Sequence, residues 1–407
     1  MVLTNEQENA IKKAKEWYLS DDKKPFVLLG CAGSGKSTIV SFIVDGLGLN
    51  PESEVKYVTF TGKAASVLIK KGNPATTIHK LIYIPMIGAN GKIKGFEKRE
   101  SLEDKNIKLI VADEFYMISD HIMKDLLSFN IKIICLGDNN QLPPPFGSVT
   151  ELCNKPDAVL TKPLRQSLDN PIVYLAVKAM NHEYIKPGDY GNNVQVIRKT
   201  NLDLERLKNT DQIIVGKNDT AKKFNKFYRM NFKNIDRDNW MPQQGEKLIC
   251  LKNNWNLSCS ENNIETNLVN GLTLYLENDI DYIESLAYGI GNLRPDFYQD
   301  HNFKNIKLDL LYFMYNFNKD SDVDDEENIA KYQYGRILSK RELNFSTGNY
   351  LDSFTYGYAI TTHKSQGSEW KDVFFIFEPF GNSRKDIYWQ MLYTGITRAS
   401  ESLTVAI

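Results

Sequence analysis

An apolar run that leads directly into a glycine-rich loop is the feature that most constrains the fold of this chain. Residues 26–29 (FVLL) precede GCAGSGKST at residues 30–38, which fits the pattern G-x-x-x-x-G-K-[ST]. In such a pattern a buried strand enters a loop whose backbone N–H groups surround phosphate oxygens, and a helix begins at the loop. The following STIVSFIVDGL has the apolar spacing of that helix. The sequence therefore predicts a parallel α/β fold built around a phosphate-binding loop.

Further apolar runs of strand length recur along the chain with helical patterns between them. A first set lies at 56–60, 107–114 and 131–138, and a second set at 211–218, 356–364, 372–378 and 402–407. Uninterrupted apolar strands that alternate with helices are typical of doubly wound parallel sheets. We therefore expect two α/β domains.

Two insertions interrupt this alternation. Residues 83–104 contain GANGK and have the pattern of a β-hairpin arm. Residues 251–350 are rich in Asn, Asp, Tyr and Leu and read as a small β-rich domain, whose acidic run at 320–328 we expect to be a solvated loop. We accordingly predict a first α/β domain at 1–82 and 105–165, and a second at 166–250 and 351–407.

Composition excludes several other classes of protein. With 407 residues the chain exceeds one ordinary core, and its net charge of −1 excludes a uniformly basic nucleic-acid binder, although not a local basic groove. No apolar run approaches the roughly 20 residues of a membrane span, and the N-terminus lacks the apolar core of a signal peptide. The five cysteines include no CxxC pair, which favours a reduced intracellular protein without structural zinc.

Carboxylates follow the third predicted strand. In the glycine loop, Lys36 is expected to reach the β- and γ-phosphates of a nucleotide, and Ser37 to ligate Mg²⁺. Asp113 and Glu114 end an apolar run, at the sheet edge that faces the loop, so we expect Asp113 in the Mg²⁺ shell and Glu114 to orient or deprotonate the attacking water. The alternative without function is a chance match in a glycine-rich turn for the loop, and a surface carboxylate pair for Asp113 and Glu114.

Gln141 lies in CLGDNNQLPPP, just after the next predicted strand. An amide beside a γ-phosphate can sense whether that phosphate is present, and the proline run at 143–145 would stiffen the connection. A capped turn explains the same residues equally well.

The order of motifs resembles that of a superfamily 1 helicase of the RecD-like branch, most closely the phage Dda type. The motifs are GCAGSGKST, the DE pair, GDNNQLPPP, LTKPLRQ at 160–166, THKSQGSEW at 362–370 and YTGITRA at 393–399. The likeness runs from LTNEQENA at residue 3 to the C-terminus. It implies two RecA-like P-loop NTPase domains, a small arm called 1B, and a β-rich, SH3-like insertion called 2B.

The resemblance also implies the residues of an ATP and Mg²⁺ site. Catalytic roles fall on Lys36, Glu114 and Gln141, with Arg165 and Arg398 as arginine fingers on the γ-phosphate. Guanidinium groups suit this role because they are always charged and bind phosphate bidentately. Gln7 matches a glutamine that reads the adenine edge. The predicted nucleotide contacts are Gln7, Gly30, Ala32, Gly33, Ser34, Gly35, Lys36, Ser37, Thr38, Gln366, Gly367 and Glu369, with Ser37 and Asp113 on the metal.

Contacts to single-stranded DNA follow from the same resemblance. They fall on hydroxyl, lysine and histidine residues that suit backbone binding without sequence readout. The residues are Thr59, Thr61, Lys63, Thr76, Thr77, His79, Thr361 and His363. A buried structural histidine is the favoured alternative for His79. The arm, with Tyr83, Ile84, Pro85, Met86 and Phe96, is placed like a pin that splits base pairs, or it merely packs on its own domain.

The resulting hypothesis is an ATP-dependent helicase that moves 5′→3′ on single-stranded DNA and unwinds duplex. A translocase that remodels protein–DNA complexes, an RNA motor and a non-motor P-loop enzyme such as a kinase stay open as alternatives. The expected partners are single-stranded DNA, strand junctions, and single-strand-binding or replication proteins. We expect a functional monomer. Its expected location is the cytoplasm, which is that of the host cell if the protein is phage-encoded. Phe115 and Tyr116 after the DE pair are bulkier than the family pattern, which puts coupling in question.

Overall fold

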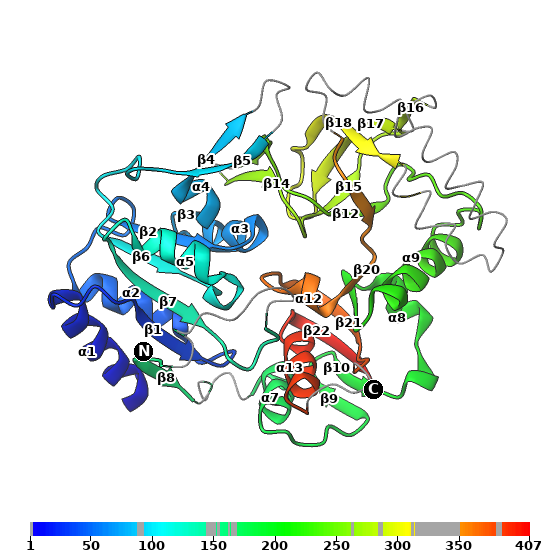
Figure 1. Cartoon of the computed structure of the whole chain (residues 1–407). Helices are drawn as coiled ribbons and strands as arrows, with labels where there is room; N and C mark the ends of the chain where they lie inside the picture. Colours follow the sequence, from blue (N-terminus) through cyan, green and yellow to red (C-terminus); the bar gives the residue numbers. More distant parts are fainter. Residues whose placement is uncertain are drawn as a thin grey trace. The chain divides into compact units, whose positions relative to one another are not determined.

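The computed structural model describes residues 3–87, 93–143, 152, 155–161, 163, 169–261, 264–283, 288–310, 313, 351–379 and 385–407. Residues 1–83, 98–217 and 361–407 form one compact unit, and residues 84–97 and 218–360 form a second. Figure 1 shows the chain coloured from the N-terminus in blue to the C-terminus in red. Arg165, the GANGK turn and the acidic run at 320–328 lie outside the described residues.

The first sheet of the first unit is parallel and has the order β3-β2-β6-β7-β1-β8. The strands are β1 (Phe26–Gly30), β2 (Val55–Thr59), β3 (Ala75–Thr77), β6 (Leu109–Ala112), β7 (Lys132–Gly137) and β8 (Ala158–Leu160). Four of them coincide with the predicted runs. The short strands β3 and β8 were not predicted, because three residues leave too little periodicity to detect.

Helices cover both faces of this sheet. They are α1 (Asn5–Leu19), α2 (Lys36–Gly46), α3 (Gly62–Lys70), α4 (Ile78–Ile82) and α5 (Asp120–Leu127), with a 3₁₀ turn η1 (Phe115–Met117). Successive strand residues point to opposite faces. Leu28 accordingly packs with α1 and α2, and Leu29 packs in the separate core formed with α4 and α5.

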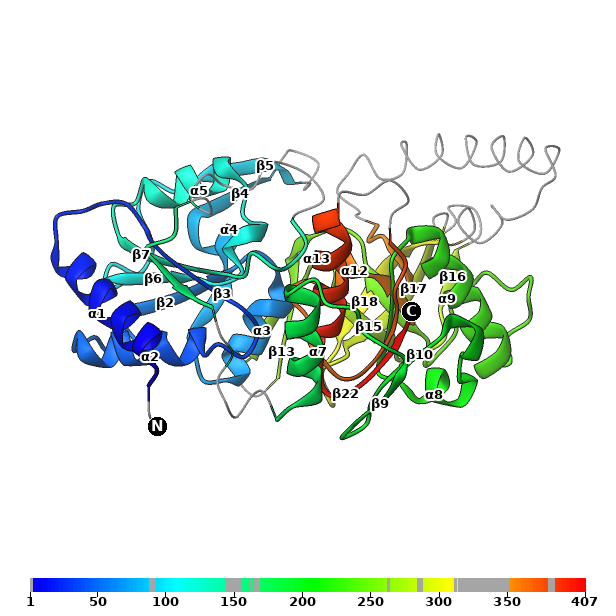
Figure 2. The same ribbon diagram turned by 90° about the horizontal axis from the view of Figure 1, so that it is seen from below.

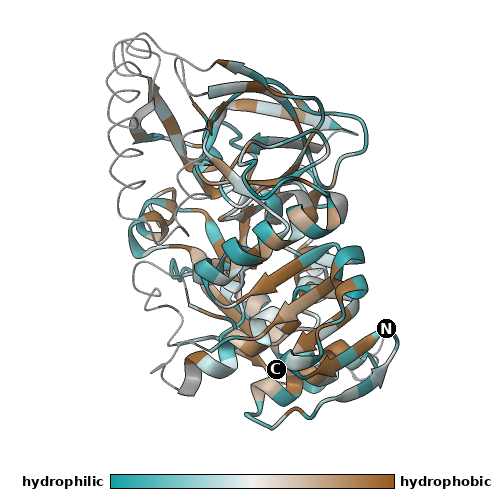
Figure 3. Cartoon of the chain, turned by 90° about the vertical axis from the view of Figure 1, so that its right-hand side faces the viewer, coloured by the Kyte–Doolittle hydropathy of each residue, from teal (hydrophilic) through white to brown (hydrophobic). Residues whose placement is uncertain are grey.

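The second sheet of this unit has the order β20-β11-β21-β22-β10-β9. Its strands are β9 (Gly188–Gly191), β10 (Val194–Ile197), β11 (Gln212–Val215), β20 (Ala359–Thr361), β21 (Trp370–Ile376) and β22 (Ala399–Ala406). β11, β21, β22 and β10 are parallel, and β9 adds an antiparallel edge. The strands near the C-terminus are drawn largely in the hydrophobic colour in Figure 3, as expected for a sheet covered on both faces.

Helices of this second sheet domain include two that lie side by side, α7 (Pro171–Met180) and α13 (Lys385–Ile396), as Figures 1 and 2 both show. The described part of this domain also contains α8 (Leu204–Asn209), α12 (Thr362–Ser365) and the 3₁₀ turn η3 (Lys199–Asn201). Both sheets confirm the prediction of two α/β domains.

Among its described residues, the second unit contains α9 (Asn218–Phe232), an antiparallel sheet and two ribbons. The sheet has the order β16-β17-β15-β12-β19, with β18 paired to β17. Its strands are β12 (Lys247–Cys250), β15 (Thr273–Leu276), β16 (Asp281–Ile283), β17 (Tyr288–Pro295), β18 (Phe303–Asp309) and β19 (Phe354–Tyr356). β12 and β19 lie just outside the predicted limits of 251 and 350. One ribbon pairs β13 (Asn254–Glu261) with β14 (Ile264–Leu268).

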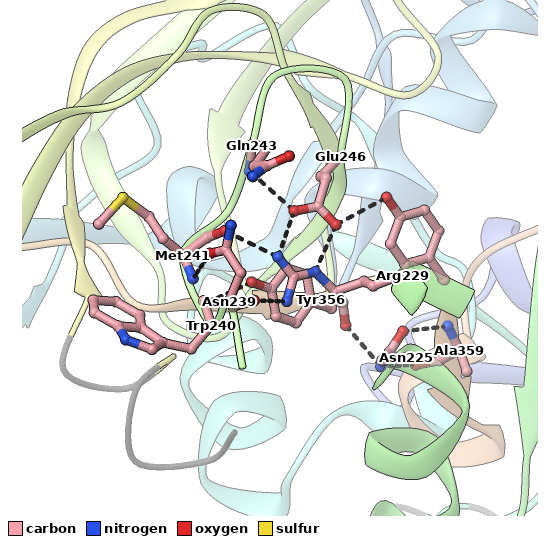
Figure 4. Close-up of polar contacts among 10 residues, drawn as sticks. Asn225, Arg229, Asn239, Trp240, Met241, Gln243, Glu246, Tyr356 and Ala359 are labelled. Atoms are coloured by element: carbon pink, nitrogen blue, oxygen red, sulfur yellow. Dashed lines mark hydrogen bonds and ion pairs between the residues drawn. The ribbon is translucent and has the colours of Figure 1, made fainter. Parts of the chain in front are cut away.

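A buried ion pair joins α9 to the loop before β12 (Figure 4). Arg229 Nε and Nη2 donate to the two carboxylate oxygens of Glu246 at 2.8 and 3.0 Å, and each side chain is 1% exposed. The remaining guanidinium donors bond the carbonyls of Asn239 and Met241. Such a pair is tolerated because its hydrogen bonds are satisfied, and removing either partner would leave a buried charge.

The arm is the second ribbon, formed by β4 (Tyr83–Ile87) and β5 (Ile93–Lys98), which agrees with the predicted hairpin. Tyr83 is buried in the core of the first sheet domain, where its hydroxyl donates to Asp125 Oδ2 at 2.5 Å. Its inclusion among the candidate pin residues was therefore wrong. Ile84, Met86 and Phe96 are the exposed apolar side chains of the arm.

Candidate nucleotide-binding site

The phosphate loop connects β1 to α2 and depends on glycine at three positions. Gly33 and Gly35 have φ of 72° and 84°, in the left-handed region that glycine adopts without steric cost. A Cβ on Gly30 would lie 2.5 Å from Ser34 Oγ. Gly35 is also the N-cap of α2, and no described side chain caps that helix. The first N–H groups of α2 therefore keep their hydrogens available for an anion.

Polar side chains converge on this loop. Lys36 Nζ donates to the carbonyls of Gly30 and Cys31 at 2.6 and 3.1 Å. Gln7 Nε2 donates to Ser34 O at 3.0 Å, and Gln7 Oε1 accepts from the N-cap Thr4 of α1, so this glutamine holds α1 against the loop. Ser34 Oγ is buried and has no hydrogen-bond partner among the described residues. A phosphate oxygen would satisfy it, so these residues fit a nucleotide.

The Cys31 side chain is not a nucleophile of this site. It is 4% exposed, and burial, followed by the nearby Asp138 carboxylate, raises its pKa to about 11. A thiol with that pKa is almost fully protonated at neutral pH.

The two predicted carboxylates follow β6. Glu114 has a left-handed backbone with φ 52° and ψ 38°, an uncommon conformation for a side chain of this size. Gln141 Nε2, after β7, donates to Glu114 Oε1 at 3.4 Å. Burial raises the pKa of Asp113 to about 6, the negative charge of Glu114 adds to this, and Lys36 opposes it. Lys36, Asp113, Glu114 and Gln141 are thus gathered at one sheet edge, as predicted.

Phe115 and Tyr116, the bulky pair after Glu114, pack over Gly137 at the end of β7. Their ring centroids lie 5.1 Å apart. A Cβ on Gly137 would lie 2.6 Å from the nearest ring atoms of both. The absence of a side chain at Gly137 is what accommodates the two rings between β6 and β7.

The second sheet domain contacts the loop that carries Gln141. Leu142 N donates to Thr394 Oγ1 at 2.8 Å, and Gln366 Nε2 donates to Leu142 O at 2.6 Å. Both backbone groups of Leu142 are therefore held by side chains of the second domain. Tyr393 Oη accepts from Ala32 N in the phosphate loop at 2.6 Å and donates to Asp138 Oδ2 at 2.5 Å. Asp138, Tyr393 and Thr394 were not among the site residues predicted from the sequence, although the last two lie in the YTGITRA motif.

The candidate residues of the second domain differ in their surroundings. Arg398 is 6% exposed, and its guanidinium donates to Thr394 O, Ser368 O and Thr397 Oγ1. Gly367 has φ 68°, and a Cβ there would lie 3.1 Å from Thr61 Oγ1. Glu369 is exposed. Gly367 thus lies near the interface of the two sheet domains, whereas the guanidinium of Arg398 is hydrogen-bonded within the second domain.

Three of the threonines predicted to bind DNA are N-caps of helices. Thr61, Thr77 and Thr361 accept from backbone N–H groups at the starts of α3, α4 and α12. Thr59 is fully buried, and its hydroxyl donates to Thr61 O at 2.8 Å. Each of these three caps satisfies one of the backbone N–H groups at the start of its helix.

The other DNA candidates are buried or half-buried. Lys63 is 5% exposed, and its ammonium lies 4.0 Å from the centroid of the Trp370 ring. The His79 ring lies against Phe60 and Tyr83, and burial lowers its pKa. Burial lowers the pKa of His363 as well, and Thr76 is half-buried. Lys63 and Trp370 connect the two sheet domains directly.

A magnesium site at this edge would use Ser37, which is exposed in the first turn of α2, and Asp113 at the end of β6. The described residues contain no group of three or more His, Cys, Asp or Glu side chains arranged to hold a metal. Phosphate oxygens of a nucleotide would have to complete the shell, which agrees with the usual binding of Mg²⁺ through few protein ligands. None of the described helices is long and apolar enough to cross a bilayer.

Fold and site together define a P-loop protein with two RecA-like domains. Two family models match: an AAA domain over residues 7–147 and a UvrD-like helicase C-terminal domain over residues 356–406. The Pif1 helicase of Bacteroides in complex with ADP-AlF3 and single-stranded DNA has a similar fold, with a TM-score of 0.52, 16% identity, and coverage of 100% of this chain and 93% of that one.

Proteins that are similar in sequence include two named DNA helicases. The ATP-dependent RecD2 DNA helicase of Deinococcus radiodurans is 33% identical over 182 residues, covering 42% of this chain and 24% of the relative. The ATP-dependent DNA helicase dda of phage T4 is 29% identical over 146 residues, covering 35% and 33%. An uncharacterised protein of Methanocaldococcus jannaschii is 24% identical and covers 94% of this chain, which spans only 36% of that relative. The chain is thus similar in sequence to RecD- and Dda-type DNA helicases over parts of its length, and in fold to Pif1 helicases.

Proposed function

We propose that this protein is an ATP-dependent DNA helicase that translocates on single-stranded DNA in the 5′→3′ direction and unwinds duplex. The main observation behind the proposal is that side chains of the second RecA-like domain form hydrogen bonds with the Asp138–Leu142 loop of the first domain. Thr394 and Gln366 hold Leu142, and Gln141 in the same loop contacts Glu114. A motor needs such a connection, because hydrolysis in one domain must move the other.

Within this proposal, ATP and Mg²⁺ bind at the edge formed by the phosphate loop and the two carboxylates. Lys36 binds the β- and γ-phosphates, Ser37 and Asp113 ligate Mg²⁺, and Glu114 orients the attacking water. Gln141 sits beside Glu114, where it can report on the γ-phosphate. Arg398 and Arg165 act as arginine fingers. To reach the γ-phosphate, Arg398 must break some of the hydrogen bonds that it forms with Thr394 and Ser368 in the second domain.

Single-stranded DNA runs over the starts of α3, α4 and α12 in this proposal. These helices begin at Thr61, Thr77 and Thr361, two in the first RecA-like domain and one in the second. Alternating grip at the two domains would convert the hydrolysis cycle into steps. The Bacteroides Pif1 structures with single-stranded DNA support the choice of substrate by analogy of fold. The 5′→3′ polarity rests on the family resemblance alone.

The arm completes the proposed architecture as 1B and the antiparallel sheet as an SH3-like 2B, which then includes β12 and β19 just outside the predicted limits of 251 and 350. The exposed Ile84, Met86 and Phe96 are the arm side chains available to stack on a terminal base pair. Both arginine fingers lie in the same chain, so we propose that the monomer is functional, with single-strand-binding or replication proteins as partners in the cytoplasm.

A translocase that remodels protein–DNA complexes is the main competing function, and an RNA motor is the next. Steady-state ATPase rates measured with no nucleic acid, with oligo(dT) and with oligo(U) distinguish a DNA motor, an RNA motor and a non-motor enzyme from one another. We expect stimulation by oligo(dT), and none in Lys36→Ala. Equal rates with and without nucleic acid would refute a motor of either kind, and stimulation by oligo(U) alone would favour the RNA motor.

A further inference from the structure

The hydroxyl of Tyr393 bonds two loops of the first RecA-like domain from a helix of the second. Tyr393 lies in the last turn of α13 and is 1% exposed. Its Oη accepts from Ala32 N at 2.6 Å and donates to Asp138 Oδ2 at 2.5 Å. One hydroxyl thus connects the phosphate loop after β1 to the loop after β7 (Figure 1 shows α13 in red).

The direction of these bonds is fixed by the protonation of the phenol. Burial, followed by the carboxylate of Asp138, raises the pKa of Tyr393 well above its ordinary value. The phenol therefore stays protonated and must donate its single hydrogen to Asp138, leaving its lone pairs to accept from Ala32 N.

Asp138 in turn accepts hydrogen bonds from the residues that follow it, Asn140 and Gln141. Its other oxygen, Oδ1, accepts from the backbone N and the side-chain Nδ2 of Asn140 at 3.0 and 2.9 Å, and its carbonyl accepts from Gln141 N at 3.2 Å. Asp138 is 2% exposed, so water does not compete for these bonds. The turn that aims Gln141 at Glu114 is thus built on the carboxylate that Tyr393 holds.

Thr394, the next residue of α13, holds the far end of the same loop through Leu142 N. Two consecutive side chains of α13 therefore fix the start and the end of the Asp138–Leu142 loop, and one of them also bonds the phosphate loop. A displacement of the phosphate loop relative to α13 cannot occur without changing one of these bonds.

We propose that Tyr393 is a positioning residue for ATP hydrolysis, whose hydroxyl sets the phosphate loop and the Gln141 loop at one separation and so couples the second RecA-like domain to Glu114. This inference rests on the proposed function. It predicts that loss of the hydroxyl impairs turnover more than nucleotide binding, because only Ala32 N belongs to a predicted nucleotide contact, whereas the Asp138 carboxylate supports the turn that carries Gln141.

The test compares Tyr393→Phe with Tyr358→Phe in the full chain. Tyr358 is a buried tyrosine whose hydroxyl also donates to a buried carboxylate, Glu246, in the unit that holds none of the candidate nucleotide residues. With oligo(dT) present, we expect kcat to fall about tenfold in Tyr393→Phe, because this is the effect expected from the loss of one buried hydrogen-bonding group. The Kd of a fluorescent ADP analogue should change less than about threefold in both variants.

Hydrogen exchange gives a readout that needs no turnover. In Tyr393→Phe, amide exchange should accelerate in the phosphate loop and in the 138–142 segment together, and Asp138→Asn should produce the same paired effect. The double variant should then add little, since both changes remove one bond network. A kcat equal to that of Tyr358→Phe, or acceleration in only one of the two segments, would overturn the coupling role. A wild type without DNA-stimulated hydrolysis would refute the proposed function, and the exchange result would still decide the role of Tyr393.

Discussion

Gln141 and Glu114 meet at the carboxyl ends of β7 and β6, where Gln141 Nε2 donates to Glu114 Oε1 across 3.4 Å. Glu114 holds this position with a left-handed backbone, φ 52°, which costs a non-glycine residue about 1–3 kcal/mol. Strain of this kind persists only where the surrounding structure enforces it, and here it aims a carboxylate at the edge that carries the phosphate loop.

Replacement of this carboxylate separates its chemical role from its backbone cost. Glu114→Gln should lower kcat for ATP by at least about 10², the usual contribution of a general base, while nucleotide affinity is retained. Glu114→Gly should lose the same activity yet be about 1 kcal/mol more stable than Glu114→Gln, because glycine adopts φ 52° freely. Steady-state kinetics and urea unfolding midpoints measure the two effects. Loss of nucleotide binding in Glu114→Gln would make Glu114 a structural residue instead.

Asp113 should lower the stability of the protein at neutral pH. Its pKa is raised from 3.8 to about 6 in the folded chain, so the folded state binds the proton more tightly than the unfolded state. Stability therefore falls as pH rises from about 4 to about 6, and the deficit persists above that range. Asp113→Asn should gain roughly 1–3 kcal/mol at pH 7.5 in EDTA, and almost nothing at pH 4.

The control for this prediction is Asp300→Asn, at an exposed aspartate of the second unit, which should change stability by less than about 0.5 kcal/mol at either pH. An equal gain for Asp113→Asn at pH 4 and pH 7.5 would show that the effect is unrelated to ionisation.

Gly137 should be indispensable because of the bulky pair that follows Glu114. A methyl group there would lie 2.6 Å from the rings of Phe115 and Tyr116, and such overpacking costs about 1–3 kcal/mol. Gly188→Ala is the matched control, since a Cβ there meets nothing within 4 Å. We expect Gly137→Ala to lower the urea midpoint, and Tyr116→Ala to restore part of it in the double variant. A midpoint unchanged from that of Gly188→Ala would refute the packing argument.

Lys63 should exchange its aromatic partner for DNA. Its ammonium lies 4.0 Å from the Trp370 centroid, an interaction worth about 0.5–2 kcal/mol that a backbone phosphate must replace. Lys63→Ala should reduce the slope of log K against log salt by about 0.7 for oligo(dT), one phosphate contact. Trp370→Leu should tighten binding severalfold by releasing the lysine.

Lys12→Ala is the control for that experiment, because Lys12 is 74% exposed on α1, away from the predicted DNA path. A salt slope that is the same in Lys63→Ala and Lys12→Ala would remove Lys63 from the DNA interface.

Much of this site could be predicted from the sequence, because its parts are local. The phosphate loop is contiguous, and Asp113 and Glu114 follow an apolar run that ends at the same sheet edge. The left-handed backbone of Glu114 could not be predicted, since a glutamate carries no signal for it. Tyr393 was missed for a different reason: its partners Ala32 and Asp138 lie 361 and 255 residues away, and only the packed fold brings them together. The three-residue strands β3 and β8 fell below the length at which periodicity is visible.

The measurement that tests the central claim most directly is unwinding of a duplex that bears a single-stranded tail at only its 5′ or only its 3′ end, with ATP and Mg²⁺. We expect unwinding of the 5′-tailed duplex, no unwinding of the 3′-tailed duplex, and no unwinding of either duplex by Lys36→Ala. Unwinding from the 3′ tail alone would contradict the polarity, and DNA-stimulated hydrolysis without unwinding of either duplex would contradict the helicase itself and favour a translocase.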